Sequence, residues 1–152
     1  MATISRAALE LSSPSFEDQS YIPARYTCEG QNINPAIRIA KIPDGTESLA
    51  LIVDDPDAPG GTFNHWLVWN IEPSDLIEED SVPGVEGRNG WGETGYRGPC
   101  PPSGTHHYHF KLYALDSKLD LKEGAERSLL DQAMMGHIVG MGALLGLYRK
   151  SK

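Results

Sequence analysis

Two clusters of polar and titratable residues interrupt the apolar runs of this chain. The first is the stretch DDPDAPGGTFNHW at residues 54–66, where aspartates, prolines, glycines and a histidine stand between two apolar segments. Asp55 closes the first segment, and Asp57 and Pro59 follow in the turn. His65 opens the second segment, so the turn would place it opposite Asp55 across one rim. A turn whose aspartates bond their own backbone has the same composition, so this stretch alone leaves a turn and a functional site equally open.

The second cluster is RGPCPPSGTHHYHF at residues 97–110, where a loop of glycine, proline and cysteine leads into a histidine-rich strand. The two clusters place four of the five histidines and the aspartates at the ends of expected strands, which predicts that they meet at one end of the fold. Side chains alternate between the two faces of a strand. His106 and Tyr108 therefore share one face. His107 and His109 share the other, so at most one of these pairs points into a common pocket.

Three chemistries could use such a pocket. A metal site would need a pattern such as Cys-x-x-Cys or paired histidines on one helix, and neither occurs, so we expect no metal ion and no cofactor. A nucleophilic enzyme would need Ser or Cys beside a histidine. Cys100 is close to His106 in sequence, but no nucleophile-elbow pattern surrounds it. Imidazole N–H, tyrosine hydroxyl and backbone N–H groups are donors to phosphate or carboxylate oxygens, so an anion-binding pocket fits the residue types best.

Four apolar runs are expected to form the strands that hold these clusters: residues 48–55, 65–73, 108–115 and 141–149. Elsewhere, Pro and Gly interrupt every short run. This pattern favours a mainly β fold, an antiparallel β-sandwich with one or two short helices and long connections that carry the chemistry.

One helix is predicted near the carboxyl end, where apolar residues recur on one face of a 3.6-residue period at Leu130, Ala133, Met134, His137 and Ile138. Ser128 with Asp131 resembles a capping box that would begin this helix, and Gly140 would end it. Because it shares the apolar face, His137 is expected to be a core histidine with one hydrogen-bond partner.

The connection at residues 81–105 consists almost entirely of Gly, Pro and polar residues, yet it contains Trp91, Tyr96 and Cys100. A loop of this length is unusual unless it builds a site. We therefore expect residues 88–105 of this loop to be ordered, with Trp91 and Tyr96 packing the loop rather than forming a pocket wall.

The composition excludes several classes of function. The 152 residues suit one domain, which we assign to residues 1–152. A net charge of -8 and a pI near 5.0 argue against nucleic-acid binding and against docking on an anionic membrane. No segment is long enough to span a bilayer, and no leader pattern begins the chain, so we expect a cytoplasmic protein. In that compartment Cys28 and Cys100 are more often reduced than joined.

These motifs resemble those of the phosphatidylethanolamine-binding protein family, in its short bacterial and archaeal branch often called Raf-kinase-inhibitor-like. DPDAP followed by a histidine, GPCPP with HHYHF, YTCEGQNINPAIRI and GHIVGMGALLGLYRK cover nearly the whole chain. The resemblance implies a β-sandwich with a small anion pocket at one end, which receives phosphate-like groups such as the phosphorylethanolamine head group. The ligand-binding residues that it implies are Asp55, Asp57, Pro59, His65, Gly98, Cys100, His106 and Tyr108. Among these, Gly98 and Cys100 would offer backbone N–H groups, and Tyr108 its hydroxyl.

Three departures from the family pattern limit what is carried over. His107 stands where many relatives have an arginine, so a salt bridge of that arginine is not transferred. Phe63 lies near the position of a tryptophan in longer eukaryotic relatives, which implies a smaller aromatic lip. The sequence stops at Lys152, without the additional carboxyl-terminal helix of those relatives, so we carry over no kinase regulation through that surface.

The sequence therefore favours a non-enzymatic binding protein for a small anionic ligand. Either a protonated His65 or His106, or a proton shared between Asp55 and the ligand, would offset the repulsion between Asp55 and the anion. A hydrolase that uses Asp55 and His65 as a base dyad, or a metal ion, is one alternative. An interaction module of the kinase-inhibitor or protease-inhibitor type is another. The sequence leaves a protein partner and a homodimer open, and it predicts neither nucleic-acid binding nor membrane insertion.

Overall fold

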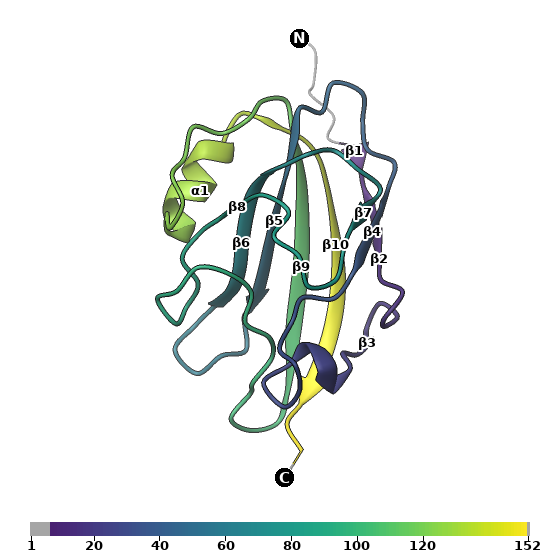
Figure 1. Ribbon diagram of the computed structural model, residues 1–152, viewed down its shortest axis with the longest axis vertical. Coiled ribbons are helices and arrows are strands. Elements are labelled where there is room, and N and C mark those ends of the chain that lie inside the picture. The colour runs from purple at the N-terminus through teal and green to yellow at the C-terminus, as the bar shows by residue number, and fades with distance from the viewer. Residues whose placement is uncertain (1–6, 152) are drawn as a thin grey trace.

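Two β-sheets, one α-helix and one 3-10 helix make up the computed structural model, which describes residues 7–151 (Figure 1). The strands of the larger sheet are β1 (Ala7–Ala8), β3 (Ser20–Tyr21), β5 (Ser48–Asp55), β6 (Phe63–Ile71), β8 (Val85–Glu86), β9 (Thr105–Leu115) and β10 (Ile138–Arg149). The smaller sheet contains β2 (Glu10–Ser12), β4 (Ile37–Ala40) and β7 (Leu76–Ile77). The helices are η1 (Ala24–Tyr26) and α1 (Arg127–Met134). The predicted mainly β fold with one or two short helices is confirmed.

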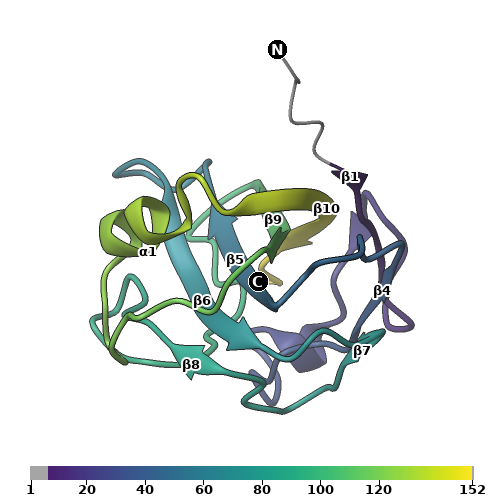
Figure 2. The same cartoon turned by 90° about the horizontal axis from the view of Figure 1, so that it is seen from above.

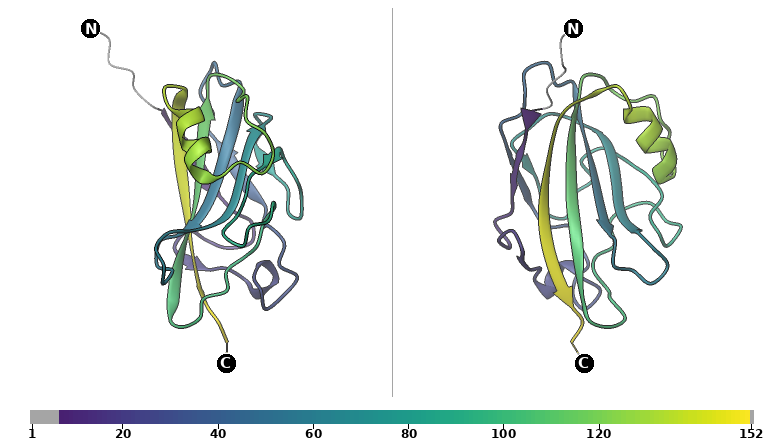
Figure 3. Two further views of the ribbon diagram at one scale, coloured as in Figure 1. Left: turned by 90° about the vertical axis from the view of Figure 1, so that its left-hand side faces the viewer. Right: turned by 180° about the vertical axis from the view of Figure 1, so that it is seen from behind.

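The larger sheet has the strand order β1-β10-β9-β5-β6-β8, and β3 also pairs with β10. The long strands pair in the antiparallel sense, as predicted. The two short strands β1 and β3 pair with β10 in parallel. The sequence did not predict these two strands, because each is only two residues long and too short to show an alternation of apolar and polar side chains. The two longest strands, β9 and β10, run side by side along the sheet (Figure 3).

The larger sheet is covered on both faces. Figure 2 shows α1 on one side of this sheet and β4 and β7 on the other. Leu49, Leu51 and Val53 of β5 belong to the core cluster that includes residues of the smaller sheet. Ala50 and Ile52 belong to the cluster that includes the buried residues of α1. Because successive side chains enter different clusters, every residue of β5 is buried, including the two aspartates that end it.

Three of the four predicted strands begin earlier than their apolar runs indicated. The run at residues 48–55 coincides with β5, whereas β6 begins at residue 63 rather than 65, β9 at 105 rather than 108, and β10 at 138 rather than 141. The polar residues that open β9 join the strand because β10 supplies backbone partners, as in the pairing of His106 with Tyr148. Pairing with a neighbour thus extends strands beyond the hydrophobic pattern.

The helix α1 is shorter than predicted. It ends at Met134, and Gly136 then turns the chain with a φ of 83°, a left-handed conformation that glycine adopts freely. Ile138 therefore begins β10 instead of extending the helix, and Gly140 lies inside that strand. Within residues 7–151, no helix has both the length and the apolar character needed to cross a lipid bilayer.

Two side-chain assignments near α1 are also wrong. Glu126, not Ser128, occupies the N-cap position, and no side-chain hydrogen bond caps the helix. His137 is not a core residue, because the turn places it at the surface with 45% of its side chain exposed. Its expected hydrogen-bond partner exists and is the carboxylate of Asp116, 2.8 Å from Nδ1.

The loop at residues 88–105 follows a defined path, which supports the expectation that it is ordered. The side-chain oxygen of Asn89 accepts hydrogen bonds from the backbone N–H groups of Trp91 and Glu93. The hydroxyl of Tyr96 donates to the backbone oxygen of Tyr26 at 2.7 Å. The loop is thus held by its own turn and by the amino-terminal segment.

Candidate functional site

A cavity of about 170 Å³ lies where three strand ends meet. Strand β5 is antiparallel to both β6 and β9, so its carboxyl end lies beside the amino ends of its two neighbours. In this register Asp55 is opposite Phe63, and Asp54 is opposite His109. The predicted meeting of strand entrances and exits at one end of the fold is confirmed.

Six of the eight ligand-binding residues expected from the sequence line this cavity: Asp55, Pro59, His65, Cys100, His106 and Tyr108. The other lining residues are Ala58, Phe63, Trp91, Pro101 and Pro102. Asp57 and Gly98 are not among the lining residues. Of the two alternating pairs on β9, the one that reaches the cavity is His106 with Tyr108.

Asp55 orients the ring of His106. Nδ1 of His106 lies 2.6 Å from Oδ2 of Asp55, and both side chains are buried. The second carboxylate oxygen of Asp55 accepts the backbone N–H of Asp57 at 2.8 Å. Both oxygens therefore accept hydrogen bonds, and no hydrogen bond within residues 7–151 involves Nε2 of His106. The alternative of a base dyad paired Asp55 with His65, whereas the pairing of β5 with β9 brings His106 to this carboxylate.

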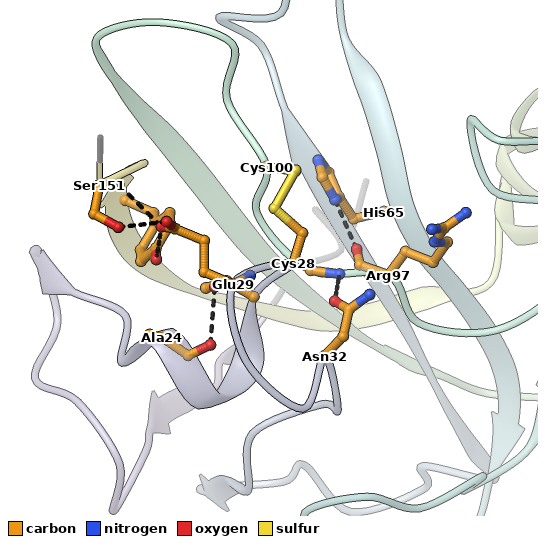
Figure 4. Close-up of a disulfide and its surroundings, with 11 residues drawn as sticks. Ala24, Cys28, Glu29, Asn32, His65, Arg97, Cys100 and Ser151 are labelled. Atoms are coloured by element: carbon orange, nitrogen blue, oxygen red, sulfur yellow. Dashed lines mark hydrogen bonds between the residues drawn. A yellow bond between two sulfur atoms is a disulfide. The ribbon is translucent and has the colours of Figure 1, made fainter.

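His65 is held by the loop rather than by Asp55. Its Nδ1 lies 2.7 Å from the backbone carbonyl oxygen of Arg97 (Figure 4). A carbonyl oxygen can only accept, so Nδ1 carries the hydrogen. Burial lowers the pKa of His65 below its ordinary value, which disfavours the imidazolium form. His106, and not His65, is the histidine whose ring lies against a carboxylate.

Tyr108 brings a hydroxyl group into the cavity. Its side chain is almost completely buried, and the hydroxyl forms no well-aligned hydrogen bond within residues 7–151. The backbone N–H of Cys100 lies near the hydroxyl oxygen, but an N–H group cannot accept the hydroxyl proton. Burial raises the pKa of Tyr108, so the hydroxyl keeps its proton at physiological pH. Tyr108 is therefore a neutral donor that the protein itself leaves unused.

Aromatic rings form one wall of the cavity. The ring centroids of Phe63 and Trp91 are 4.6 Å apart, and those of His65 and Trp91 are 5.2 Å apart, in edge-on arrangements. The guanidinium group of Arg97 lies over the Trp91 ring, 4.8 Å from its centroid. The expectation that Trp91 only packs the loop is wrong, because the loop folds back onto β6. Trp91 thereby adds to the small aromatic lip that was expected from Phe63.

Asp57 lies outside the cavity and pairs with His107. One oxygen of Asp57 accepts both the backbone N–H of His107 at 2.8 Å and the ring Nδ1–H at 2.6 Å. The hydrogen bond from the His107 ring is the main reason why the pKa of Asp57 is lowered. His107 thus ties the turn after β5 to β9.

Gly98 and Cys100 hold the loop in place. The N–H of Gly98 donates to Oδ1 of Asn32 at 2.7 Å, and a Cβ atom at Gly98 would lie 2.0 Å from the backbone oxygen of Tyr26. This N–H is therefore not free for a ligand. Cys100 forms a disulfide with Cys28, with Cα atoms 5.5 Å apart (Figure 4). The expectation of reduced thiols is wrong, because it rested on the compartment and not on the loop packing that brings these residues together.

Sequence reasoning missed three residues of the cavity: Ala58, Pro101 and Pro102. Their side chains carry no chemistry that a motif could reveal, and the only signal was their place beside Pro59 and Cys100 in DPDAP and GPCPP. Within residues 7–151, no three His, Cys, Asp or Glu side chains are grouped so that they could hold a metal ion.

The sequence matches a known family over most of its length. The sequence pattern of the phosphatidylethanolamine-binding proteins matches residues 12–149. A UPF0098 protein of Pyrococcus horikoshii is 49% identical over 157 residues, covering 95% of this chain and 78% of the relative. A UPF0098 protein of Methanothermobacter thermautotrophicus is 47% identical over 150 residues, covering 93% and 99%.

Solved structures show the same fold. The crystal structure of a phosphatidylethanolamine-binding protein homologue from Chlamydia trachomatis has a TM-score of 0.91 at 39% identity, covering 95% of this chain and 99% of that one. YbcL of E. coli, described as a member of the mammalian family, has a TM-score of 0.87 at 28% identity, covering 95% and 100%. The chain therefore belongs to the phosphatidylethanolamine-binding protein family, in its bacterial and archaeal branch.

Proposed function

We propose that this protein is a non-enzymatic binding protein whose cavity takes a small phosphate-like anion, such as the phosphorylethanolamine head group. The observation that carries this proposal is the buried hydroxyl of Tyr108, which lines the cavity and whose proton has no acceptor within residues 7–151. A buried donor left unpaired costs about 1–3 kcal/mol. An oxygen of a bound anion would remove that cost.

The charge of Asp55 is compatible with an anion in the same cavity. Both of its oxygens accept hydrogen bonds, one of them from the ring of His106. A protonated His106 would balance the carboxylate and present Nε2–H as a second, charge-assisted donor. The cavity would then be neutral before the anion enters.

The size and lining of the cavity support binding rather than covalent catalysis. A volume of about 170 Å³ is below the roughly 300–1,000 Å³ of pockets for drug-sized ligands, so it suits a head group and not a whole lipid. The lining contains no serine or threonine, and the sulfur of Cys100 is bonded to Cys28. A partner protein could present a phosphate group on a phosphorylated side chain, and this phosphate would accept hydrogen bonds from Tyr108 and His106 in the same way.

Calorimetric titration with O-phosphorylethanolamine tests the proposal. Tyr108→Phe removes only the hydroxyl, and we expect it to weaken binding by about 5- to 10-fold, the value of one hydrogen bond. Tyr113→Phe is the matched control, because Tyr113 lies on the same strand and packs against the cluster under α1. If Tyr108→Phe bound as tightly as the parent, the role of the hydroxyl would be refuted. Hydrolysis of phosphate or carboxylate esters would favour the hydrolase alternative.

A further inference from the structure

We infer that His65 makes the cavity selective for phosphate monoesters that still carry one proton, over sulfate esters and phosphodiesters of equal charge. The inference rests on the proposed anion site and specifies the class of anion that it takes. It follows from the direction of the hydrogen bonds around the cavity.

The first step concerns the position of the proton on His65. The carbonyl oxygen of Arg97, 2.7 Å from Nδ1, requires a hydrogen on that nitrogen. A neutral imidazole carries only one hydrogen, so Nε2 presents a lone pair. Burial disfavours a second proton on this ring, which agrees with the lowered pKa.

The second step concerns what Nε2 faces. His65 lines the cavity, and Figure 4 shows its second ring nitrogen directed away from Arg97. Within residues 7–151, the hydrogen bond that the His65 ring forms is the one from Nδ1 to Arg97, and the hydroxyl of Tyr108 does not bond to Nε2. The backbone of Gly98 also lies near the ring and favours the protonated form, but burial opposes it more strongly and lowers the pKa of His65. An acceptor is therefore left for the ligand to satisfy.

The third step compares this set of groups with possible ligands. Tyr108 offers a donor, His106 offers a donor when its ring is protonated, and His65 offers an acceptor. A phosphate monoester monoanion has bare oxygens for the two donors and one O–H for the acceptor. A sulfate ester or a phosphodiester has only bare oxygens, so one of them would have to face the lone pair of His65. A site that leaves a buried polar group unpaired rejects such an analogue.

The surrounding charges do not explain such a preference. The ionisable groups that face His65 are Asp55 on the neighbouring strand β5 and Tyr108 on β9, with Asp54 nearby and His106 in the same cavity. Arg97, whose carbonyl holds the ring, directs its guanidinium to Trp91 and Glu93. A monoester monoanion and a sulfate ester carry the same single charge, so these groups act equally on both. Only the proton distinguishes the two ligands.

The test is calorimetric titration of the full-length protein with ethyl phosphate, ethyl sulfate and diethyl phosphate. At pH 6 we expect ethyl phosphate to bind at least about tenfold more tightly than the other two. The preference should shrink at pH 8, because a phosphate monoester loses its second proton near about pH 6. O-phosphorylethanolamine and glycerophosphoethanolamine distinguish the sources of the group, since the free head group is a monoester and the lipid head group is a diester. We expect O-phosphorylethanolamine, the monoester, to bind more tightly than glycerophosphoethanolamine.

His65→Gln replaces the fixed lone pair by an amide that can turn either its oxygen or its N–H to the ligand, so the preference for ethyl phosphate over ethyl sulfate should fall several-fold. His107→Gln is the control, because His107 pairs with Asp57 outside the cavity, and it should keep the preference of the parent. Nitrogen-15 NMR of the parent reads the tautomer directly, even if His65→Gln does not fold. A hydrogen on Nε2 of neutral His65 would overturn the inference. Equal binding of ethyl phosphate and ethyl sulfate would overturn the selectivity alone, whereas binding of neither would also overturn the proposed anion site.

Discussion

Breaking the Cys28–Cys100 disulfide should lower the stability of the folded protein substantially. The two cysteines are 72 positions apart in sequence, so the bond closes a long loop in the unfolded chain. The loop-closure relation gives a contribution of about 4 kcal/mol at 25 °C for a loop of this length. Cys28 is exposed and Cys100 is only partly buried, so little packing is lost when the bond opens. The destabilisation therefore arises mainly from the greater freedom of the unfolded chain.

Urea denaturation of the oxidised protein, the reduced protein and the Cys28→Ala/Cys100→Ala variant measures this effect. With a slope of about 2 kcal/mol/M, the midpoint should fall by about 2 M in both the reduced protein and the variant. As a control, reductant added to the variant should leave its urea midpoint unchanged, because the variant has no disulfide to reduce. Because Cys100 lines the cavity, the reduced protein should also bind O-phosphorylethanolamine more weakly.

A midpoint that shifts by less than about 0.5 M on reduction would refute this reasoning. Two free thiols in protein purified without reductant, measured by mass spectrometry after alkylation, would also contradict it. That result would restore the expectation of reduced cysteines that the sequence alone supported.

Two further predictions concern His65 and Gly98. Burial lowers the pKa of His65 in the folded protein, so the unfolded chain binds more protons at acidic pH. The stability that neutral His65 contributes is therefore complete above about pH 6.5, the ordinary pKa of histidine. It is lost as the pH falls towards the lower pKa of the folded state. Urea midpoints should therefore fall less steeply between pH 8 and pH 5 for His65→Gln than for the parent, and equal slopes would argue against the shift. Gly98→Ala should destabilise the protein by about 1–3 kcal/mol or more, because its Cβ would meet the backbone oxygen of Tyr26 at 2.0 Å. Gly60→Ala, with nothing within 4 Å of its Cβ, should leave the thermal midpoint nearly unchanged.

The accuracy of the sequence predictions depended on how local the signal was. Strand β5 was predicted to the residue because its apolar run is uninterrupted and the turn DPDAP follows directly. The end of α1 was missed because His137 and Ile138 continue the helical period, and only the left-handed turn at Gly136 shows that the chain has reversed. A periodic pattern records which residues are apolar, but it does not record where the backbone changes direction.

In the cavity too, the residues placed by a strand period were predicted correctly, and a residue placed by a loop was not. The alternation of β9 correctly paired His106 with Tyr108, since that depends only on the period of a strand. Trp91 was assigned to packing because its loop has no period, and its place beside Phe63 depends on how that loop folds back onto β6.

The sequence by itself determined which residues are able to do chemistry and which strand end each occupies, because these follow from residue type and from the period of two along a strand. Only the tertiary structure decided which partner each residue meets. Asp55 meets His106 at a separation of 51 positions, and Nδ1 of His65 meets the carbonyl oxygen of Arg97 at a separation of 32. Strand pairing and loop closure bring such distant groups together, and no local pattern encodes them. The hydrogen-bond direction of His65, and with it the proposed selectivity, therefore depends on the fold.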